Sequence, residues 1–211
     1  MKLYTRWQNS AGERVRIALN LKGLDYDYVA VGSLAPGEYQ RINPLALMPT
    51  LEVDGQVIAQ SAAILDYLEE RYPSPSLLPD DLILRAQARA FGAAIAAEMH
   101  AIAVNRVRKF LIEDLALGEA GADRWAKHWH KLGFEALEAT LARRAVEFPF
   151  CFSDEPGWAD LHLVPQLARS RGLGVDVSPY KRLLAVEARC VDLPAFRKAR
   201  PDQQIDYPGA G

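Results

Sequence analysis

Residues 50–59 carry the pattern that most limits how this chain of 211 residues can fold. Two four-residue runs, 50–53 and 56–59, flank the pair Asp54-Gly55. An Asp-Gly pair readily adopts the positive φ angles of a tight two-residue turn, so the pattern predicts a β-hairpin. Two neighbouring antiparallel strands are thereby placed in the first third of the chain.

The segments on either side of the hairpin complete the pattern of a mixed α/β domain. A short strand begins near Tyr4, apolar residues line one face of a helix over 13–22, and a second strand covers 26–31. After the hairpin, Ser61 is expected to cap a helix that continues to residue 72. The order strand, helix, strand, a further helix, two strands and a helix is typical of a thioredoxin-like domain.

A proline- and serine-rich stretch, residues 73–79, marks a domain boundary. Beyond it the pattern is helical and begins with a long alanine-rich segment over 82–114, whose small residues permit close approach of another helix or of a second subunit. We therefore expect an α/β domain over 1–76, a linker over 77–81 and an all-α domain over 82–211. From residue 201 onward the sequence has the composition of a polar tail.

Charge and composition exclude several classes of protein. The formal net charge of −2 gives no electrostatic basis for binding nucleic acid or an anionic membrane. No apolar run approaches the roughly 20 residues that span a bilayer, and the N-terminus lacks the apolar core of a secretory signal, so we expect a soluble, cytoplasmic protein. Cys151 and Cys190 are expected to be buried thiols. Because His128 and His130 diverge on a helix, we expect no metal site.

Three short segments carry candidate binding chemistry: residues 9–16, residues 43–50 and the pair Gln60-Ser61. A helix N-terminus at Ser61 presents unpaired N–H groups and a partial positive charge that suit a carboxylate, although an ordinary capping serine looks the same in sequence. Pro49 cannot donate to a β-ladder, which places it at a turn or a sheet edge. Donors at the start of a helix lower the pKa of a bound thiol.

In this order and spacing the three segments resemble the glutathione-binding domain of the soluble glutathione transferases, and most closely the zeta class, which includes maleylacetoacetate and maleylpyruvate isomerases. The run Arg14-Val15-Arg16-Ile17-Ala18-Leu19 matches a zeta-class motif, and the resemblance extends over roughly residues 1–207. It implies glutathione as the cofactor, a homodimer, and a small electrophile or organic acid as the substrate.

The resemblance also implies a role for individual residues. Gln60 and Ser61 would hold the γ-glutamyl group of glutathione, and Met48 would contact its peptide part through the main chain, next to a cis bond at Pro49. His100 matches a histidine that reaches glutathione from the neighbouring subunit in some zeta-type isomerases. A polar contact inside the helical domain explains His100 equally well.

The sulfur and substrate positions depart from the zeta-class pattern. Where the family carries a Ser-Ser-Cys triplet, this chain has Asn9, Ser10 and Ala11. Both Asn9 and Ser10 can donate a hydrogen bond to a thiolate, and the sequence does not choose between them.

Family isomerases place arginines at three positions that bind the substrate's carboxylates. Only one of the three is kept here, as Arg106, because Gln8 and Gly172 occupy the other two, the latter beside Arg171. Two functions therefore stay open. One is glutathione-dependent isomerisation of a maleyl-type acid or conjugation of a small electrophile. The other is a glutathione-binding protein with little catalytic activity.

One further segment resembles the family. Residues 153–160 resemble a transferase folding motif in which a hydroxyl residue normally caps a helix. Gly157 replaces that residue, so only the Asp160 half of a capping box is expected to remain.

Overall fold

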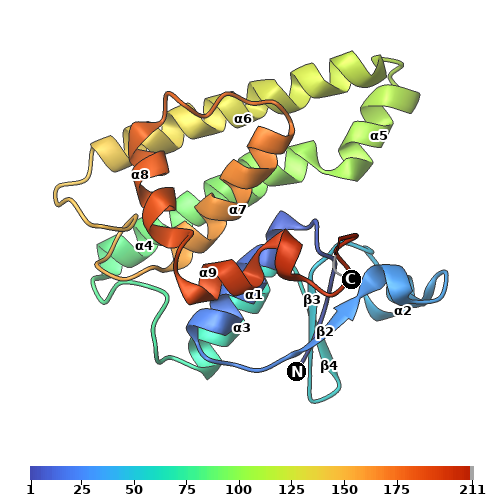
Figure 1. Cartoon of the computed structure of the whole chain (residues 1–211), viewed down its shortest axis with the longest axis horizontal. Coiled ribbons are helices and arrows are strands. Elements are labelled where there is room, and N and C mark those ends of the chain that lie inside the picture. The colour runs from blue at the N-terminus through green and yellow to red at the C-terminus, as the bar shows by residue number, and fades with distance from the viewer. Residues whose placement is uncertain (210–211) are drawn as a thin grey trace. The chain divides into compact units, whose positions relative to one another are not determined.

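The structure, a computed structural model, describes residues 1–209 and divides into two units by its internal contacts (Figure 1). The first unit joins Met1–Leu77 to the C-terminal segment that starts at Val191, and the second is Leu78–Cys190. The expected fold class is confirmed, because the first unit is built on a mixed four-stranded sheet and the second is helical. No helix within residues 1–209 is long and apolar enough to cross a membrane.

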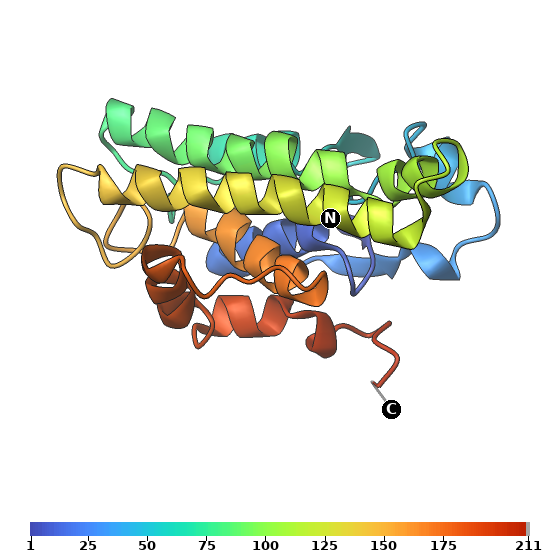
Figure 2. The same cartoon turned by 90° about the horizontal axis from the view of Figure 1, so that it is seen from above.

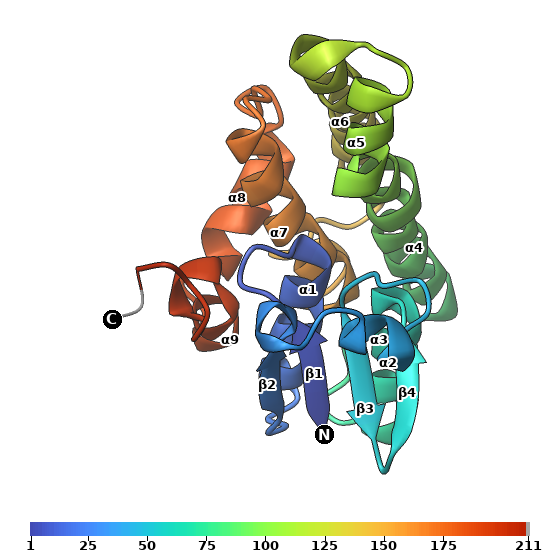
Figure 3. The same cartoon turned by 90° about the vertical axis from the view of Figure 1, so that its right-hand side faces the viewer.

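The sheet of the first unit has the strand order β2-β1-β3-β4 (Figure 3). Its strands are β1 (Lys2–Thr5), β2 (Asp27–Ala30), β3 (Thr50–Val53) and β4 (Gln56–Ala59). Strand β1 runs parallel to β2 and antiparallel to β3. The predicted hairpin is confirmed, with Asp54 and Gly55 at φ angles of 50° and 75° in the turn between β3 and β4.

Helices cover both faces of this sheet. Helices α1 (Ser10–Leu21) and α3 (Ser61–Arg71) pack together on one face, whereas the short α2 (Glu38–Ile42) lies on the other (Figure 1). A 3-10 turn, Val31–Ser33, follows β2. The core between sheet and helices consists of fully buried apolar side chains from both layers: Leu3, Leu51, Val15, Ile17, Ile64, Leu65 and Leu68.

The C-terminal segment packs with the first unit, although the sequence assigned residues 82–211 to the helical domain. Helix α9 (Pro194–Ala199) contacts α1, and Arg16 of α1 donates from Nε to the Ala199 carbonyl over 3.0 Å. A 3-10 turn, Pro201–Gln203, follows. The expected tail is also engaged, because the Asp206 carboxylate accepts hydrogen bonds from the Trp7 amide and the Tyr28 hydroxyl. The last two residues, 210 and 211, lie outside the described part of the chain.

The second unit consists of helices arranged along the long helix α6 (Figure 2). They are α4 (Leu82–Ala93), α5 (Asn105–Glu113), α6 (Gly118–Ala142), α7 (Trp158–Gly172) and α8 (Lys181–Cys190). The prediction of one helical stretch over 82–114 is wrong at residues 101–104, where the helix is interrupted. A π-helical segment, Ala94–His100, and a 3-10 turn, Ala101–Ala103, follow α4, and β-branched Val104 is extended, with ψ of 161°.

Three details of the second unit agree with the sequence. The Gly157 amide donates to Asp160 Oδ2 over 2.9 Å at the start of α7, which is the expected half of a capping box. Cys151 and Cys190 are buried, unbridged thiols. Gly92 of α4 lies so close to α7 that a Cβ atom there would be 2.8 Å from Trp158 Nε1, which is the close helix approach that small residues permit.

A buried histidine links α6 to α7. The Nδ1 atom of His130 lies 2.9 Å from the Ser170 hydroxyl, and its Nε2 atom lies 3.3 Å from the Gln166 side-chain nitrogen. Burial lowers the pKa of His130 from 6.5 to about 4. The folded protein therefore disfavours the protonated imidazole, whereas the unfolded chain accepts the proton below about pH 6.5.

We expect His130 to destabilise the fold as the pH falls from about 6.5 to 4, by about 3 kcal/mol at the lower limit. Urea unfolding at pH 7 and pH 4 measures this loss. In His130→Gln the pH dependence should be smaller by that amount, whereas His128→Gln, at an exposed position on the same helix, should retain it. An identical pH dependence in His130→Gln and the unmodified protein would contradict the prediction.

Candidate functional site

The loop after β1 leads directly into the N-terminus of α1. Helix α1 begins at Ser10, three residues before the predicted start, because Asn9 caps it. Asn9 is extended, with φ of −142°, and its Oδ1 atom accepts a hydrogen bond from the Gly12 amide. Its Nδ2 amide makes no hydrogen bond within residues 1–209. The sequence predicts Asn9 and Ser10 as candidate thiol donors but does not reveal the capping role of Asn9.

The cap of α1 requires glycine at position 12. A Cβ atom at Gly12 would lie 2.0 Å from Thr5 Oγ1 and 2.8 Å from Asn9 Oδ1. Thr5 ends β1, is fully buried, and its hydroxyl has no hydrogen-bond partner among the described residues. The end of β1 and the first turn of α1 are therefore packed in direct contact.

The loop between β1 and α1 is held by two other segments of the first unit. Arg16 donates from its guanidinium to the carbonyls of Arg6 and Trp7, over 3.3 and 3.4 Å. Asp206 accepts from the Trp7 amide over 3.1 Å. These contacts fix the backbone just before Asn9, so the donors at the start of α1 are positioned by rigid neighbours.

The second predicted segment lies before β3. The Met48–Pro49 bond is cis, as the resemblance implies. The Asn43 side chain holds the preceding loop, donating to the Leu47 carbonyl over 2.8 Å and to the Thr50 hydroxyl over 3.1 Å.

The third segment joins β4 to α3 and differs from the prediction. Gln60, not Ser61, occupies the N-cap position, with φ of 71° and no capping hydrogen bond from its side chain. Ser61 is the first residue of the helix, and its Oγ atom accepts from Arg14 Nη1 over 3.1 Å. Ser61 lies one residue beyond the cap position, and its hydroxyl is engaged by Arg14. The first-turn N–H groups of α3 therefore have no side-chain cap, which suits them to an anion.

The three segments meet at one end of the sheet. Strand pairing places Thr50 opposite both Tyr4 of β1 and Ala59 of β4. The residues that follow Tyr4, precede Thr50 and follow Ala59 therefore leave the sheet side by side. The Arg14–Ser61 hydrogen bond joins the first turns of α1 and α3 at the same end. The uncapped first turn of α3 and the candidate donors Asn9 and Ser10 therefore lie in one small region of the first unit.

The remaining site candidates belong to the second unit. His100 ends the π-helical segment and is half-buried. Arg106, in α5, is exposed and makes no hydrogen bond or ion pair within residues 1–209. In contrast, Arg171 forms a two-pronged ion pair with Glu187, with contacts of 2.6 and 2.5 Å. Arg108 is likewise engaged, by Asp123 and Glu119.

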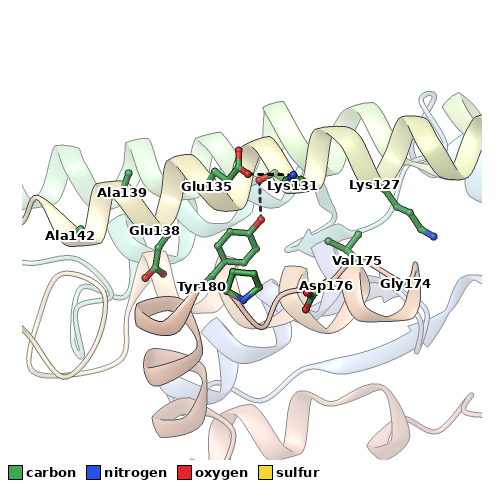
Figure 4. A pocket seen from close by; sticks show the side chains of 11 residues that line it. Lys127, Lys131, Glu135, Glu138, Ala139, Ala142, Gly174, Val175, Asp176 and Tyr180 are labelled. Carbon is green, nitrogen blue, oxygen red and sulfur yellow. Dashed lines mark hydrogen bonds and ion pairs between the residues drawn. The ribbon is translucent and has the colours of Figure 1, made fainter.

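A groove of about 770 Å³ lies between α6 and the segment that joins α7 to α8 (Figure 4). Its lining mixes acidic and basic side chains with Tyr180, whose hydroxyl donates to the Lys131 carbonyl over 3.4 Å. None of the predicted site residues lines it. Within residues 1–209, no group of three His, Cys, Asp or Glu side chains is placed to hold a metal ion.

Comparison with known proteins relates these features to a family. Residues 10–71 match the model of the glutathione S-transferase N-terminal domain. The chain is 41% identical to the maleylpyruvate isomerase of Ralstonia sp, over 98% of this chain and 99% of the relative. It is 38% identical to the maleylacetoacetate isomerase of Pseudomonas aeruginosa, over the full length of both.

The solved structures that resemble this chain include proteins of the same kind as these relatives. A holo structure of maleylpyruvate isomerase, described as a bacterial glutathione transferase of the zeta class, superposes with a TM-score of 0.92 and 40% identity, over 98% of this chain and 99% of that one. Maleylacetoacetate isomerase from Anaeromyxobacter dehalogenans, with glutathione bound in its active site, gives a TM-score of 0.87 and 38% identity, over 98% and 97%.

Proposed function

The chain belongs to the zeta class of the glutathione S-transferase family, and from that premise we propose that it catalyses the glutathione-dependent cis–trans isomerisation of a maleyl-type acid. The observation that carries the proposal is the convergence of the three segments at one end of the sheet. Relatives named as maleyl isomerases match the chain over almost its whole length.

The residues present fit glutathione. The uncapped first turn of α3, with Gln60 and Ser61, suits the γ-glutamyl carboxylate, and Met48 with cis Pro49 offers main-chain groups to the peptide. Bound glutathione supplies the thiolate that makes rotation about the maleyl double bond possible. Asn9 and Ser10 hold this sulfur as an anion, because the first turn of α1 and N–H or O–H donors favour a thiolate. Arg106 is the proposed anchor for a substrate carboxylate.

Ser61→Ala should weaken glutathione binding by about 1–3 kcal/mol, the range for losing a hydrogen bond to a charged group, which is roughly a 5- to 150-fold rise in Kd. Titration calorimetry measures this change. Ser33→Ala is the matched control, because the Ser33 hydroxyl only donates to the Ala30 carbonyl in the same unit. If the unmodified protein does not bind glutathione at millimolar concentration, the proposed function fails.

Gly172→Arg should raise kcat/KM for a dicarboxylate such as maleylpyruvate by about tenfold or more, since each charge-assisted contact contributes roughly 1.5–3 kcal/mol. The substitution causes no clash at its first side-chain atom, because a Cβ atom at Gly172 would meet nothing within 4 Å. With Gln8 and Gly172 at arginine positions, the unmodified protein should use such a dicarboxylate less well than a neutral electrophile. Arg171 and Arg108 do not compensate, since carboxylates already engage both.

The control variant for this prediction is Gly172→Gln, which adds length without charge. Both substitutions should leave the rate with a neutral electrophile unchanged. A dicarboxylate rate near the diffusional limit in the unmodified protein would contradict the argument.

The two missing arginines favour a second candidate function, a glutathione-binding protein with little catalytic activity. The ultraviolet absorbance of the bound thiolate separates the two candidates, because only an enzyme needs the sulfur anion at pH 7. A bound thiol that ionises only at its ordinary pKa would favour the second candidate.

We also infer a cytoplasmic homodimer. Exposed alanines recur along α4 and the π-helical segment that follows it, and Leu82 and Ile83 are 78% and 67% exposed, which suits a subunit contact. The alanines are Ala86, Ala90, Ala93 and Ala97. In a dimer, His100 is the proposed contact to glutathione bound by the other subunit, and sedimentation at micromolar concentration tests the assembly.

A further inference from the structure

Arg14 is a fully buried cation with an incomplete set of hydrogen bonds. Its side chain lies in α1 and is 1% exposed. Nη1 donates to Ser61 Oγ over 3.1 Å, whereas Nε and Nη2 have no partner among the described residues. No carboxylate forms an ion pair with it within residues 1–209. The neighbouring Glu13 is a weak counter-ion, because burial raises its pKa to about 7.

Such an arrangement does not serve stability. A buried charge without a paired carboxylate costs free energy, and replacing buried ionic groups by apolar residues of similar volume is often neutral or stabilising. Burial lowers the pKa of Arg14 only to about 10, so the side chain remains charged at pH 7. The positive charge is therefore maintained at a cost, next to the uncapped first turn of α3.

The hydrogen bonding of the Ser61 hydroxyl indicates a role for the positive charge of Arg14. A hydroxyl carries one donor and two acceptor positions. Because Ser61 Oγ accepts from Arg14, its own O–H is left to donate elsewhere. The first-turn N–H groups of α3 also lack a side-chain acceptor. A carboxylate at this position would accept hydrogen bonds from the Ser61 hydroxyl and from the first-turn N–H groups of α3. The positive charge of Arg14, which contacts Ser61, would attract it further.

We infer that Arg14 is a positioning residue that orients the Ser61 hydroxyl toward a ligand carboxylate and makes the start of α3 selective for a negatively charged group. This inference rests on the proposed function, in which that carboxylate belongs to the γ-glutamyl residue of glutathione. Arg14 acts through Ser61 and through its charge, without direct contact with the ligand. From the sequence alone, Arg14 is recognised only as part of the zeta-class motif over residues 14–19.

The test compares glutathione with γ-aminobutyryl-cysteinyl-glycine, an analogue that lacks only the γ-glutamyl carboxylate. The unmodified protein should prefer glutathione by about 100-fold or more, as expected for charged hydrogen bonds. Arg14→Met, which fills a similar volume without charge, should reduce this preference at least tenfold and change the affinity for the analogue less than threefold. Its melting temperature without ligand should be equal to or above that of the unmodified protein.

A merely structural role would weaken both ligands equally and lower the melting temperature. Arg16→Met is the matched control, because Arg16 is a buried arginine of the same helix whose donors go to backbone carbonyls. It should lose stability and keep the ligand preference. Arg14→Lys, which keeps the charge but loses the planar fork, should retain part of the preference, and it decides the question if Arg14→Met does not fold.

An unchanged preference for glutathione over the analogue in Arg14→Met would overturn this inference and leave the proposed function standing. If Arg14→Met does not fold, the same result in Arg14→Lys would do so. Failure of the unmodified protein to bind glutathione would instead overturn both.

Discussion

Replacing Asn9 and Ser10 together by alanine is expected to abolish catalysis, whereas either replacement alone leaves partial activity. Both residues lie at the start of α1, where each can donate a hydrogen bond to the glutathione sulfur. Losing one donor to a developing or bound anion typically reduces a rate about 10²-fold, so losing both should reduce it by about 10⁴-fold. The measurements are kcat/KM with a neutral electrophile and the thiolate absorbance of bound glutathione.

The structure supplies a variant that separates the donor role of Asn9 from its structural role. Asn9 Oδ1 caps α1 through the Gly12 amide, so Asn9→Ala also costs about 1 kcal/mol of stability. Asn9→Asp keeps the cap but has no amide donor and adds a negative charge. This variant should be as stable as the unmodified protein, but the thiol of bound glutathione should have a higher pKa in it. Full activity in the double alanine variant would show that neither side chain serves the sulfur.

Gly12→Ala is expected to cause the largest loss of stability of any single methyl addition in the first unit. The added Cβ atom would lie 2.0 Å from Thr5 Oγ1, and the Thr5 side chain is fully buried. Forcing an extra methyl group into a packed core costs about 1–3 kcal/mol, and displacing the Asn9 cap adds about 1 kcal/mol. Urea unfolding should show a loss of stability equal to the sum of these two costs. Glutathione binding should be lost together with the stability.

A second substitution tests whether the clash with Thr5 causes the loss of stability. Thr5→Ala removes the clashing Oγ1 atom, which has no hydrogen-bond partner within residues 1–209, and should partly restore Gly12→Ala. The matched control is Gly32→Ala, because a Cβ atom at Gly32 would meet nothing within 4 Å. Unfolding of Gly12→Ala at the same urea concentration as the unmodified protein would contradict the prediction.

Local sequence signals were sufficient for most elements of the first unit. Asp54-Gly55 set the turn and hence the pairing of β3 with β4, because turn geometry fixes the register of a hairpin. The helix over 13–22 was found from its apolar face, but its true start at Ser10 was not, since the capping contact of Asn9 depends on Gly12 approaching Thr5. The Asp160 half of the capping box was also readable, because both partners lie three residues apart.

Long-range contacts account for the differences. Ser61 is predicted as the cap from the sequence, yet it is the first helical residue, and its hydroxyl accepts from Arg14, 47 residues away. The polar composition after residue 200 reads as a tail, yet Asp206 binds Trp7 and Tyr28 across most of the chain length. Helix α9 packs against α1 in the first unit, where Phe196 is buried and Arg16 donates to the Ala199 carbonyl. Each of these partners is fixed by packing that no local pattern specifies.

By itself, the sequence determined the fold class and the hairpin and predicted the three segments of the proposed glutathione site, because turn chemistry, helical periodicity and family motifs are local. Only the tertiary structure decided how those segments are used. It placed them at one end of the sheet, made Gln60 the first residue before α3, and left Arg14 as a buried cation behind Ser61. The physical reason is that a polar group's role depends on which partner satisfies it, and in a folded chain that partner comes from distant residues brought together by the core.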